Sequence, residues 1–331
     1  MFRYGFYLLF GAVGIMGNGL VLFVIAMVDD LRDVANLFIA NQSLVDMMTS
    51  VLLIGSYVIP LPAMPYDSPL LARFICAFWN TRFLFWSLIV ASSLNLVLMT
   101  LERYYAIMYP IQYRSQINSH RAKVIAPIPW IIGFLYQQNL LWFTSVEDDM
   151  CLLFQFPSRL HLVSLGLLGV FLEFILPVIV VMYVHVGILR KLRKSVVKRA
   201  EGATHDRNKS NFTALERTTA DAKTRARKNV IKTLFFISVF FVVCWTPNQV
   251  IYMYYSVLNK NFADLLLYKL SVFLAFGNMC INPFIYTFQY RRFRKGLSKL
   301  CGKTSKKKNQ SNIATVNDES CTTVLNKNFN M

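Results

Sequence analysis

Long blocks of apolar residues, separated by short polar connectors, dominate the pattern of this chain. Each block holds about twenty or more mostly apolar residues, and a helix of that length crosses ~30 Å of hydrocarbon. The blocks lie at residues 4–27, 36–59, 76–107, 122–144, 161–189, 229–255 and 265–288. The pattern predicts an all-α integral membrane protein, a bundle of seven transmembrane helices.

Composition supports membrane spans rather than a soluble core. Of the 331 residues, 55% are hydrophobic and 16% are charged, whereas soluble domains carry roughly 25% charged residues. The formal net charge of +18 gathers in residues 190–228 and in the tail after Arg291. Lys and Arg in short connectors mark the cytoplasmic side and attract anionic lipid headgroups. We therefore expect contacts with membrane lipids and no binding to nucleic acid.

An odd number of spans places the two ends of the chain on opposite sides of the membrane. The basic tail predicts a cytoplasmic C-terminus, and hence an N-terminus outside the cell. The acidic connector 147–149 then lies outside and the basic connector 190–228 inside. The connector 29–33 carries one Arg and gives this orientation only weak support. We expect a seven-span domain over residues 1–300, with 190–228 as its third cytoplasmic loop, and a disordered cytoplasmic tail over 301–331. No cleavable signal peptide is expected before the first block.

Polar residues and prolines inside the spans distinguish one kind of membrane bundle from another, because polar groups in lipid are costly and usually functional. Taken singly each is a weak signal, since a proline in a span is often only a tolerated kink. They are Asn18, Asp46, Glu102-Arg103-Tyr104, Trp130, Pro177, Cys244-Trp245-Thr246-Pro247 and Asn282-Pro283-Phe284-Ile285-Tyr286. Together, in this order, they resemble the rhodopsin-like G-protein-coupled receptors over the chain to about Leu300. The basic amphipathic stretch 291–300 then predicts a short eighth helix.

The resemblance implies a role for the pair Glu102-Arg103 at the cytoplasmic end of the third span. The Glu102 carboxylate would hold the Arg103 guanidinium at rest, and on activation Arg103 would face a cavity that admits a helix of a heterotrimeric G protein. The alternative is an interfacial salt bridge, which contributes about 0–1 kcal/mol when exposed. Many relatives place a second acidic partner near the base of the sixth span, where this chain has Arg227, so we expect a looser resting lock.

Kinks at two prolines complete the mechanism that the resemblance implies. Pro247 and Pro283 each remove a backbone hydrogen bond and favour a bend in the helix. Trp245 would couple ligand contact to movement of the sixth helix, and Tyr286 would move inward with it. The residues assigned to activation and G-protein coupling are Glu102, Arg103, Tyr104, Trp245, Pro247, Asn282, Pro283 and Tyr286.

Asp46 is a carboxylate near the middle of the second span, where an unpaired charge is expensive. By resemblance its neighbours are Ser92 in the third span and Asn278 and Asn282 in the seventh. In many relatives these oxygens bind Na⁺ in the inactive state, so a sodium site is expected. A hydrogen-bonded network with water and no ion is the alternative.

The cysteines of the outer side predict a disulfide bond. Cys76 at the start of the third span and Cys151 in the connector after the fourth both face an oxidising compartment, and family members share such a bridge. Cys301 follows the basic amphipathic stretch and is a palmitoylation candidate, with a free cytosolic thiol as the alternative. The sequence has no CxxC, HExxH or phosphate-binding Gly-rich motif, so we expect neither an enzyme nor a metal centre other than the sodium site.

Two positions narrow the ligand within the family. A retinal-binding receptor needs a Lys six residues before Asn282, where Phe276 stands, so we expect no retinal. An amine receptor needs an Asp eighteen residues before Arg103, where Phe85 stands, so the pattern argues against an amine ligand.

The remaining polar and aromatic residues in the outer halves of the spans predict the ligand pocket. Arg82 needs an anion, which is Glu173, an acid of a loop or a carboxylate of the ligand; an internal pair with Glu173 and a ligand contact stay open. The spacing from Cys76 to Arg103, twenty-seven residues, is two more than is usual in the family. The expected pocket residues are Arg82, Phe85, Trp86, Ile89, Glu173, Asn248, Gln249, Tyr252 and Lys269.

An aromatic and amide-rich cavity with charges of both signs suits a peptide. The strings Cys244–Gln249 and Trp79–Arg82 resemble those of invertebrate neuropeptide receptors of the galanin or somatostatin type. We expect a receptor of the plasma membrane that binds a neuropeptide and activates G proteins. A receptor for a small acidic or lipid-like ligand is the first alternative, and a seven-helix transporter or lipid-handling protein is the second. Arrestin and receptor kinases are possible partners of the tail, at Ser311, Thr315, Ser320, Thr322 and Thr323.

Overall fold

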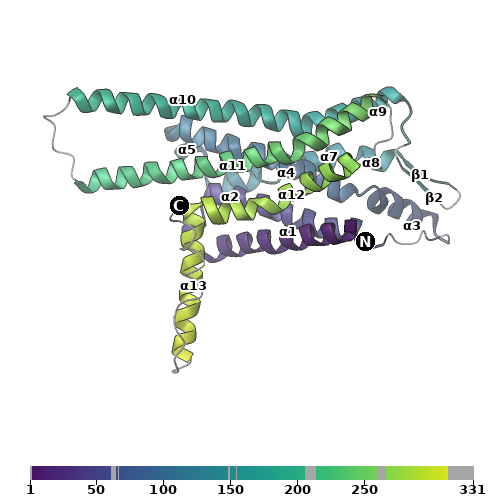
Figure 1. Ribbon diagram of the computed structural model, residues 1–331, viewed down its shortest axis with the longest axis horizontal. Coiled ribbons are helices and arrows are strands. Elements are labelled where there is room, and N and C mark those ends of the chain that lie inside the picture. Colours follow the sequence, from purple (N-terminus) through teal and green to yellow (C-terminus); the bar gives the residue numbers. More distant parts are fainter. Residues whose placement is uncertain are drawn as a thin grey trace.

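The computed structural model is an elongated helical bundle whose long helices run side by side (Figure 1). It describes residues 2–60, 65, 67–147, 150–153, 155–205, 214–258 and 266–311. Within these residues lie seven helices or runs of helices that are long and apolar enough to cross a membrane. This confirms the predicted seven spans and the all-α class.

The elements follow the expected order along the chain. The first two spans are α1 (Phe2–Met27) and α2 (Val34–Tyr57), joined by the 3₁₀ turn η1 (Asp29–Leu31). The third comprises α3 (Pro69–Phe74), η2 (Ile75–Asn80) and α4 (Phe83–Met108), and the short α5 (Pro110–Gln116) follows it. The fourth comprises α6 (Ser119–Ile125), α7 (Ile128–Gln137) and α8 (Asn139–Trp142). The fifth comprises α9 (Arg159–Val170), η3 (Phe171–Ile175) and α10 (Leu176–His205); α11 (Ala214–Leu258), α12 (Leu266–Gln289) and α13 (Arg291–Ser311) complete the chain.

Side-chain caps fix where several of these helices begin. Asp33 caps α2 by accepting a hydrogen bond from the backbone N–H of Asn36 (2.9 Å), and Asn118 caps α6 in the same way. Ser158 caps α9 by accepting from the N–H of His161 (3.2 Å). Each cap satisfies one of the N–H groups that the first helical turn leaves without a partner.

One hydrogen bond between spans compensates a proline in another. Pro283 inside α12 has no N–H, so the carbonyl of Met279, four residues earlier, loses its helical partner. Asn18 Nδ2 on α1 donates to that Met279 oxygen (3.0 Å) and to the Gly14 oxygen (2.9 Å). Gly17 permits the close approach, because a Cβ there would lie 3.0 Å from Pro283 Cγ. Asn18 therefore supplies the hydrogen bond that Pro283 cannot make to the Met279 carbonyl.

The third span is not a continuous α-helix. Its outer part, η2, is a π-helical segment, which takes more residues per turn than an α-helix. Arg82 follows with φ 57°, in the left-handed region, and α4 is regular from Phe83. The surplus in the Cys76–Arg103 spacing is therefore absorbed before Phe83.

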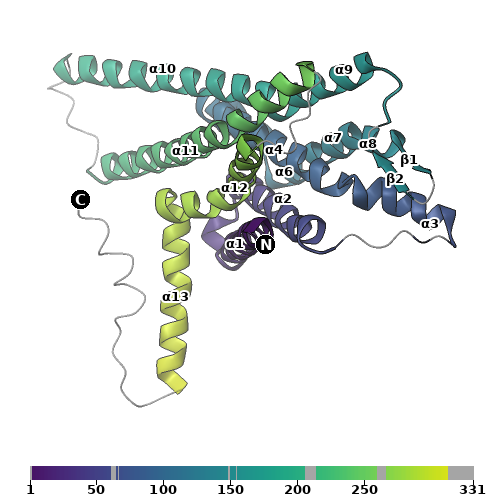
Figure 2. The same ribbon diagram turned by 45° about the vertical axis from the view of Figure 1, so that its right-hand side comes forward.

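Helices continue past three of the expected boundaries. α10 runs to His205 and α11 starts at Ala214, so the described part of the predicted loop 190–228 is helical (Figure 2). The helix α13 runs to Ser311 rather than stopping at Leu300, and residues 312–331 lie outside the described residues. Apolar composition ends where lipid ends, whereas Lys, Arg, Glu and Ala favour helix in water as well. For that reason hydropathy located the spans but not the helix ends.

The helix α13 turns away from the bundle axis (Figure 1) and is consistent with the predicted amphipathic eighth helix. Its Phe293 is buried against the bundle. Arg292 forms an ion pair with Asp33, and Lys299 forms one with Asp30 of η1. The Lys299 ammonium lowers the pKa of the exposed Asp30 carboxyl. Apolar packing and opposite charges together hold α13 beside the first connector.

We predict that Asn18→Leu destabilises the protein, because it leaves the buried carbonyl of Met279 without a donor. An unsatisfied buried acceptor costs about 1–3 kcal/mol, so the melting temperature of the purified protein in detergent should fall in a fluorescence melting scan. Met16→Leu is the matched control, since Met16 is 67% exposed on the same helix. An unchanged melting temperature for Asn18→Leu would contradict this account of the proline.

Candidate functional site

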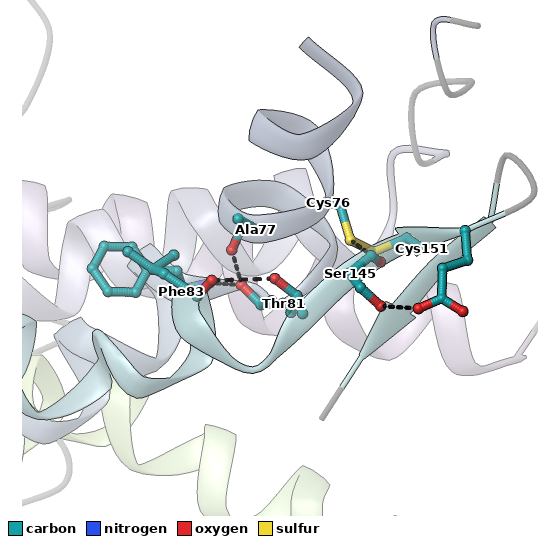
Figure 3. The surroundings of a disulfide bond; sticks show 9 residues. Cys76, Ala77, Thr81, Phe83, Ser145 and Cys151 are labelled. Atoms are coloured by element: carbon teal, nitrogen blue, oxygen red, sulfur yellow. Dashed lines mark hydrogen bonds between the residues drawn. A yellow bond between two sulfur atoms is a disulfide. The ribbon is translucent and has the colours of Figure 1, made fainter. Parts of the chain in front are cut away.

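A disulfide marks one end of the bundle, which we call the disulfide end. Cys76 of η2 and Cys151 of β2 (Met150–Leu153) are bonded, with their Cα atoms 5.5 Å apart. The strand β2 pairs antiparallel with β1 (Thr144–Glu147), and Cys151 lies opposite Val146 (Figure 3). This confirms the predicted disulfide, which fixes the hairpin to the outer part of the third span.

A threonine stabilises the helix break beside the disulfide. Thr81 Oγ1 accepts a hydrogen bond from the N–H of Phe83 (3.1 Å) and donates to the carbonyl of Ala77 (Figure 3). Thr81 is buried, so its hydroxyl closes the turn between η2 and α4. That turn sets the direction of the Arg82 side chain.

Asp46 on α2 is the centre of a buried polar cluster that joins three helices. Its Oδ1 accepts hydrogen bonds from Ser92 Oγ on α4 (2.8 Å) and from Gln42 Nε2 (3.0 Å). Its Oδ2 accepts one from Asn282 Nδ2 on α12 (2.8 Å). The amide oxygens of Asn278 and Asn282 are buried, and neither accepts a hydrogen bond from another described residue. The four residues expected for a sodium site thus all lie buried or half-buried in the bundle, three of them joined directly.

Gln42 is a member of this cluster that the sequence analysis missed. Besides Asp46, it bonds Asn95, whose Nδ2 donates to Gln42 Oε1 (2.8 Å). Asn95 in turn accepts from Asn41 Nδ2 (2.8 Å), and Asn41 accepts from Trp130 Nε1 (3.0 Å). A glutamine four residues before a buried carboxylate lies on the same helical face, and this spacing is the signal that was overlooked. The chain of amides connects Asp46 to the fourth span.

The opposite end of the bundle, which we call the Arg103 end, carries the pair Glu102–Arg103. Their side chains form an ion pair and are 6% and 18% exposed. The hydroxyl of Tyr113 on α5 donates a hydrogen bond to Glu102 Oε1. Burial, followed by the Glu102 charge, raises the pKa of Tyr113, which keeps the phenol protonated as a donor. Glu102 therefore has two partners, of which the sequence analysis found one.

A small cavity of about 10 Å³ lies against Arg103, large enough for about one water molecule. Tyr286 of the seventh span and Tyr290, which follows α12, line it, and the Tyr286 hydroxyl is buried without a hydrogen-bond partner in the described part of the chain. The side chain of Arg227, the basic replacement noted in the sequence, lies outside the described residues. The activation residues of the third and seventh spans thus meet at this cavity.

Trp245 and Pro247 lie inside α11, in its C-terminal third. The Trp245 side chain is buried, and its ring lies 6.3 Å from that of Phe241, which in turn lies 6.3 Å from Phe174 on the fifth span. Pro247 is inside the helix, two residues beyond Trp245. Movement of the fifth span against Trp245 would therefore act beside the proline kink.

The residues expected to form one ligand pocket fall into separate groups. Glu173 accepts a hydrogen bond from Gln249 Nε2 (3.4 Å). Asn248 Nδ2 donates to Ser271 Oγ (3.4 Å), and Tyr252 packs against Gly166 of α9. Arg82 is elsewhere, beside α2. The internal Arg82–Glu173 pair that the sequence left open is not formed.

Phe85 and Ile89 are core residues in this structure, 1% and 4% exposed. The Phe85 ring contacts those of Tyr57 (5.6 Å), Phe276 (5.2 Å) and Trp86 (5.3 Å). The aromatic residues at the two positions that argued against retinal and amines therefore pack on each other. Trp86 is half-buried at the edge of this cluster, and Lys269 lies half-buried on α12.

Comparison with known proteins identifies this arrangement. The sequence model described as 7 transmembrane receptor (rhodopsin family) matches residues 17–286, which include the motifs from Asn18 to Tyr286. The chain belongs to the rhodopsin family of seven-transmembrane receptors. This family consists of receptors and not of enzymes or transporters, so the match gives the transporter alternative no support.

Several relatives of this receptor are named as receptors for neuropeptides. It is 25% identical over 311 residues to galanin receptor 2a of Danio rerio, which covers 92% of this chain and 79% of that protein. It is 26% identical over 306 residues to the allatostatin-A receptor of Bombyx mori, with 88% and 76% covered. It is 24% identical over 306 residues to G-protein coupled receptor 54 of Oreochromis niloticus, with 89% and 76% covered. The resemblance to galanin-type and invertebrate neuropeptide receptors is confirmed.

We predict that Gln42→Leu lowers the stability of the receptor. The change removes a donor to Asp46 and the acceptor of Asn95, and a buried polar group left unsatisfied costs about 1–3 kcal/mol. Thermal inactivation of the purified receptor in lipid nanodiscs measures the loss. Met48→Leu, on a partly exposed position of the same helix, should leave the inactivation temperature unchanged. Equal inactivation temperatures for Gln42→Leu and the wild type would mean that the hydrogen bonds of Gln42 to Asp46 and Asn95 do not contribute to stability.

Proposed function

We propose that this receptor binds an extracellular peptide at the disulfide end and activates a heterotrimeric G protein at the Arg103 end. The observation that carries the proposal is the buried Glu102–Arg103 pair beside the Tyr286 cavity, at the end away from the disulfide. Arg103 is held by one carboxylate and lines the same cavity as Tyr286 and Tyr290, so phenol oxygens that can accept hydrogen bonds are available for an exchange of its partner. Such an exchange would free Arg103 to meet a G-protein helix.

The orientation follows from charge and redox chemistry. Disulfides persist in oxidising compartments, which favours the disulfide end on the outer face of the plasma membrane. The basic residues Arg291, Arg294 and Lys295 of α13 favour the other end on the cytoplasmic face, near anionic lipid. We therefore propose that the N-terminus lies outside and the C-terminus inside the cell.

A peptide ligand is favoured by the relatives and by the outer half of the bundle. The relatives are named as receptors for galanin, allatostatin-A and pyroglutamylated RF-amide peptide. The side chains of Glu173, Asn248 and Gln249 supply hydrogen-bonding groups between the fifth, sixth and seventh spans. A small acidic or lipid-like ligand is the second candidate, because no carboxylate among the described residues contacts Arg82.

Regulation at the cytoplasmic side stays a prediction. Cys301 lies partly exposed on α13, one residue after Leu300, which packs against the core cluster, and this position suits a palmitoyl chain that enters the same membrane face. Ser311 is the last residue of α13, and Thr315, Ser320, Thr322 and Thr323 lie outside the described residues. Receptor kinases and arrestin are the partners that we propose for these hydroxyls.

The donor set around Asp46 fits a sodium ion. The Asp46 carboxylate accepts a hydrogen bond from the Ser92 hydroxyl. The buried side-chain oxygens of Asn278 and Asn282 accept no hydrogen bond within the described residues. Oxygen ligands of this kind suit a hard cation. Gln42 Nε2 competes for the same carboxylate, so we propose a site that sodium occupies only when this donor turns aside.

We predict that Arg103→Ala abolishes most G-protein activation. Cells that express the receptor with a promiscuous G-protein reporter would be screened with galanin-, RF-amide-, allatostatin- and bombesin-type peptides, and then with small carboxylates and lysolipids. With surface expression matched, the wild type should respond to at least one peptide and Arg103→Ala should not. Equal responses of the two proteins would overturn the Arg103 mechanism. A wild-type response to the carboxylates or lysolipids alone would replace the peptide by the second candidate.

We predict that sodium stabilises the receptor and that Asp46→Asn removes this effect. A ligand that binds only the folded state raises its stability with concentration, so the melting temperature should rise when NaCl replaces choline chloride at equal ionic strength. The Asn variant keeps the shape of Asp46 but loses the charge that attracts the cation. Equal melting temperatures of the wild type in the two salts would favour a water network without an ion.

A further inference from the structure

A cavity of about 590 Å³ opens at the disulfide end, between α1, the end of α2 and the start of α4. Tyr4, Tyr7, Tyr57 and Arg82 line it. Its volume lies within the range of small-molecule pockets, roughly 300–1,000 Å³. It is separate from the Glu173–Gln249 group, which belongs to the fifth and sixth spans.

Arg82 occupies this cavity with an unusual backbone. Its φ of 57° is left-handed, and it is the only residue other than glycine with a positive φ among the described residues. Such a conformation costs about 1–3 kcal/mol in a residue with a Cβ and persists where its surroundings enforce it. Here the π-helical η2 and the Thr81 hydrogen bonds enforce it. The strain places a cation at the wall of the cavity.

The contacts of Arg82 position its guanidinium without neutralising it. Nε donates to the carbonyl of Ser56 (3.3 Å), and the guanidinium carbon lies 4.3 Å from the centre of the Tyr57 ring. A guanidinium carries five N–H donors, and the Ser56 bond accounts for one of them. No carboxylate in the described ranges reaches it. The side chain is half-buried. An anion that enters the cavity can therefore pair with the guanidinium.

The cavity wall beside Arg82 is aromatic and closely packed. Tyr7 and Tyr57 are in ring contact (4.9 Å), and both contact Phe276 (6.1 Å and 5.7 Å). Phe85 braces Tyr57 and Phe276 from the third span. A flat apolar group can pack on this wall while an anion next to it meets the arginine.

We propose that this cavity is a subsite for a carboxylate of the extracellular ligand, either a free C-terminus or an acidic side chain, flanked by an aromatic or apolar group. The inference rests on the proposed function and deepens it by naming the chemistry of the ligand. A planar guanidinium binds a carboxylate through two parallel hydrogen bonds. An amidated C-terminus offers one neutral acceptor and no charge. The subsite therefore selects the free acid over the amide.

A matched pair of probes tests the subsite without any G protein. N-acetyl-L-phenylalanine and N-acetyl-L-phenylalaninamide differ only in the acid and the amide. Their affinities for the purified full-length receptor in phosphatidylcholine nanodiscs would be measured by ligand-observed NMR titration. Because binding is read directly, its outcome is independent of whether the receptor signals as proposed above.

The wild type should bind the acid about tenfold more tightly than the amide, since hydrogen bonds to a charged carboxylate are stronger than those to a neutral amide oxygen. Arg82→Gln should lose this preference, and Arg82→Lys should keep part of it because the charge remains. Arg82→Gly relieves the left-handed backbone, so it should fold and also lose the preference. Arg73→Gln, an exposed arginine of α3 at the same end, is the matched control and should bind like the wild type.

Three results would overturn the proposal. One is equal affinity of the wild type for acid and amide, or no measurable binding of the acid. Another is an acid preference that survives both Arg82→Gln and Arg82→Gly. The third is a preference that disappears when phosphatidylglycerol is added to the nanodiscs, which would assign Arg82 to a lipid headgroup instead of the ligand.

Discussion

The carboxylate of Asp46 has to be satisfied inside the bundle, because hydrocarbon offers it neither water nor counterions. The fold meets this constraint with donors from three directions: Gln42 on its own helix, Ser92 on α4 and Asn282 on α12. These bonds fix how α2, α4 and α12 are rotated about their axes, since each donor must face the same point. Asn282 immediately precedes Pro283, so the same contact also locates the kink of the seventh span.

A second compensation follows the same rule. Pro283 leaves the Met279 carbonyl of α12 without its helical partner, and Asn18 of α1 donates to that carbonyl instead. The segment around Pro283 is therefore bonded on one side to Asp46 and on the other to Asn18. Tyr286, one turn further, is left with a buried hydroxyl beside Arg103. Hydrogen bonds from Asn18 and to Asp46 thus hold α12 on either side of Pro283, while Tyr286 lines the cavity where the proposed movement takes place.

The outer part of the third span shows how an irregular backbone can create a binding group. The π-helical η2, the Thr81 turn and the left-handed Arg82 lie within one short segment. A regular helix would have pointed an arginine in this region toward a different neighbour, because each residue adds a fixed rotation. The irregular segment instead brings Cys76 to the hairpin and Arg82 over Tyr57.

The sequence by itself determined the seven spans, the receptor family, the disulfide and the residues around Asp46, because apolar length and polar residues inside lipid are constraints that act along the chain. The hydropathy pattern did not predict where helices end outside the membrane. There α10, α11 and α13 continue because their residues favour helix in water as well. The sequence analysis also missed Gln42 and Tyr113, whose roles depend on partners from other elements. Only the tertiary structure showed that Arg82 does not pair with Glu173, because the π-helical turn changes the direction of every residue near it. The residues predicted to form one ligand pocket lie in separate groups, one around Glu173 and one around Arg82. Phe85 and Ile89 are core residues, and Phe85 packs against Tyr57 beside Arg82.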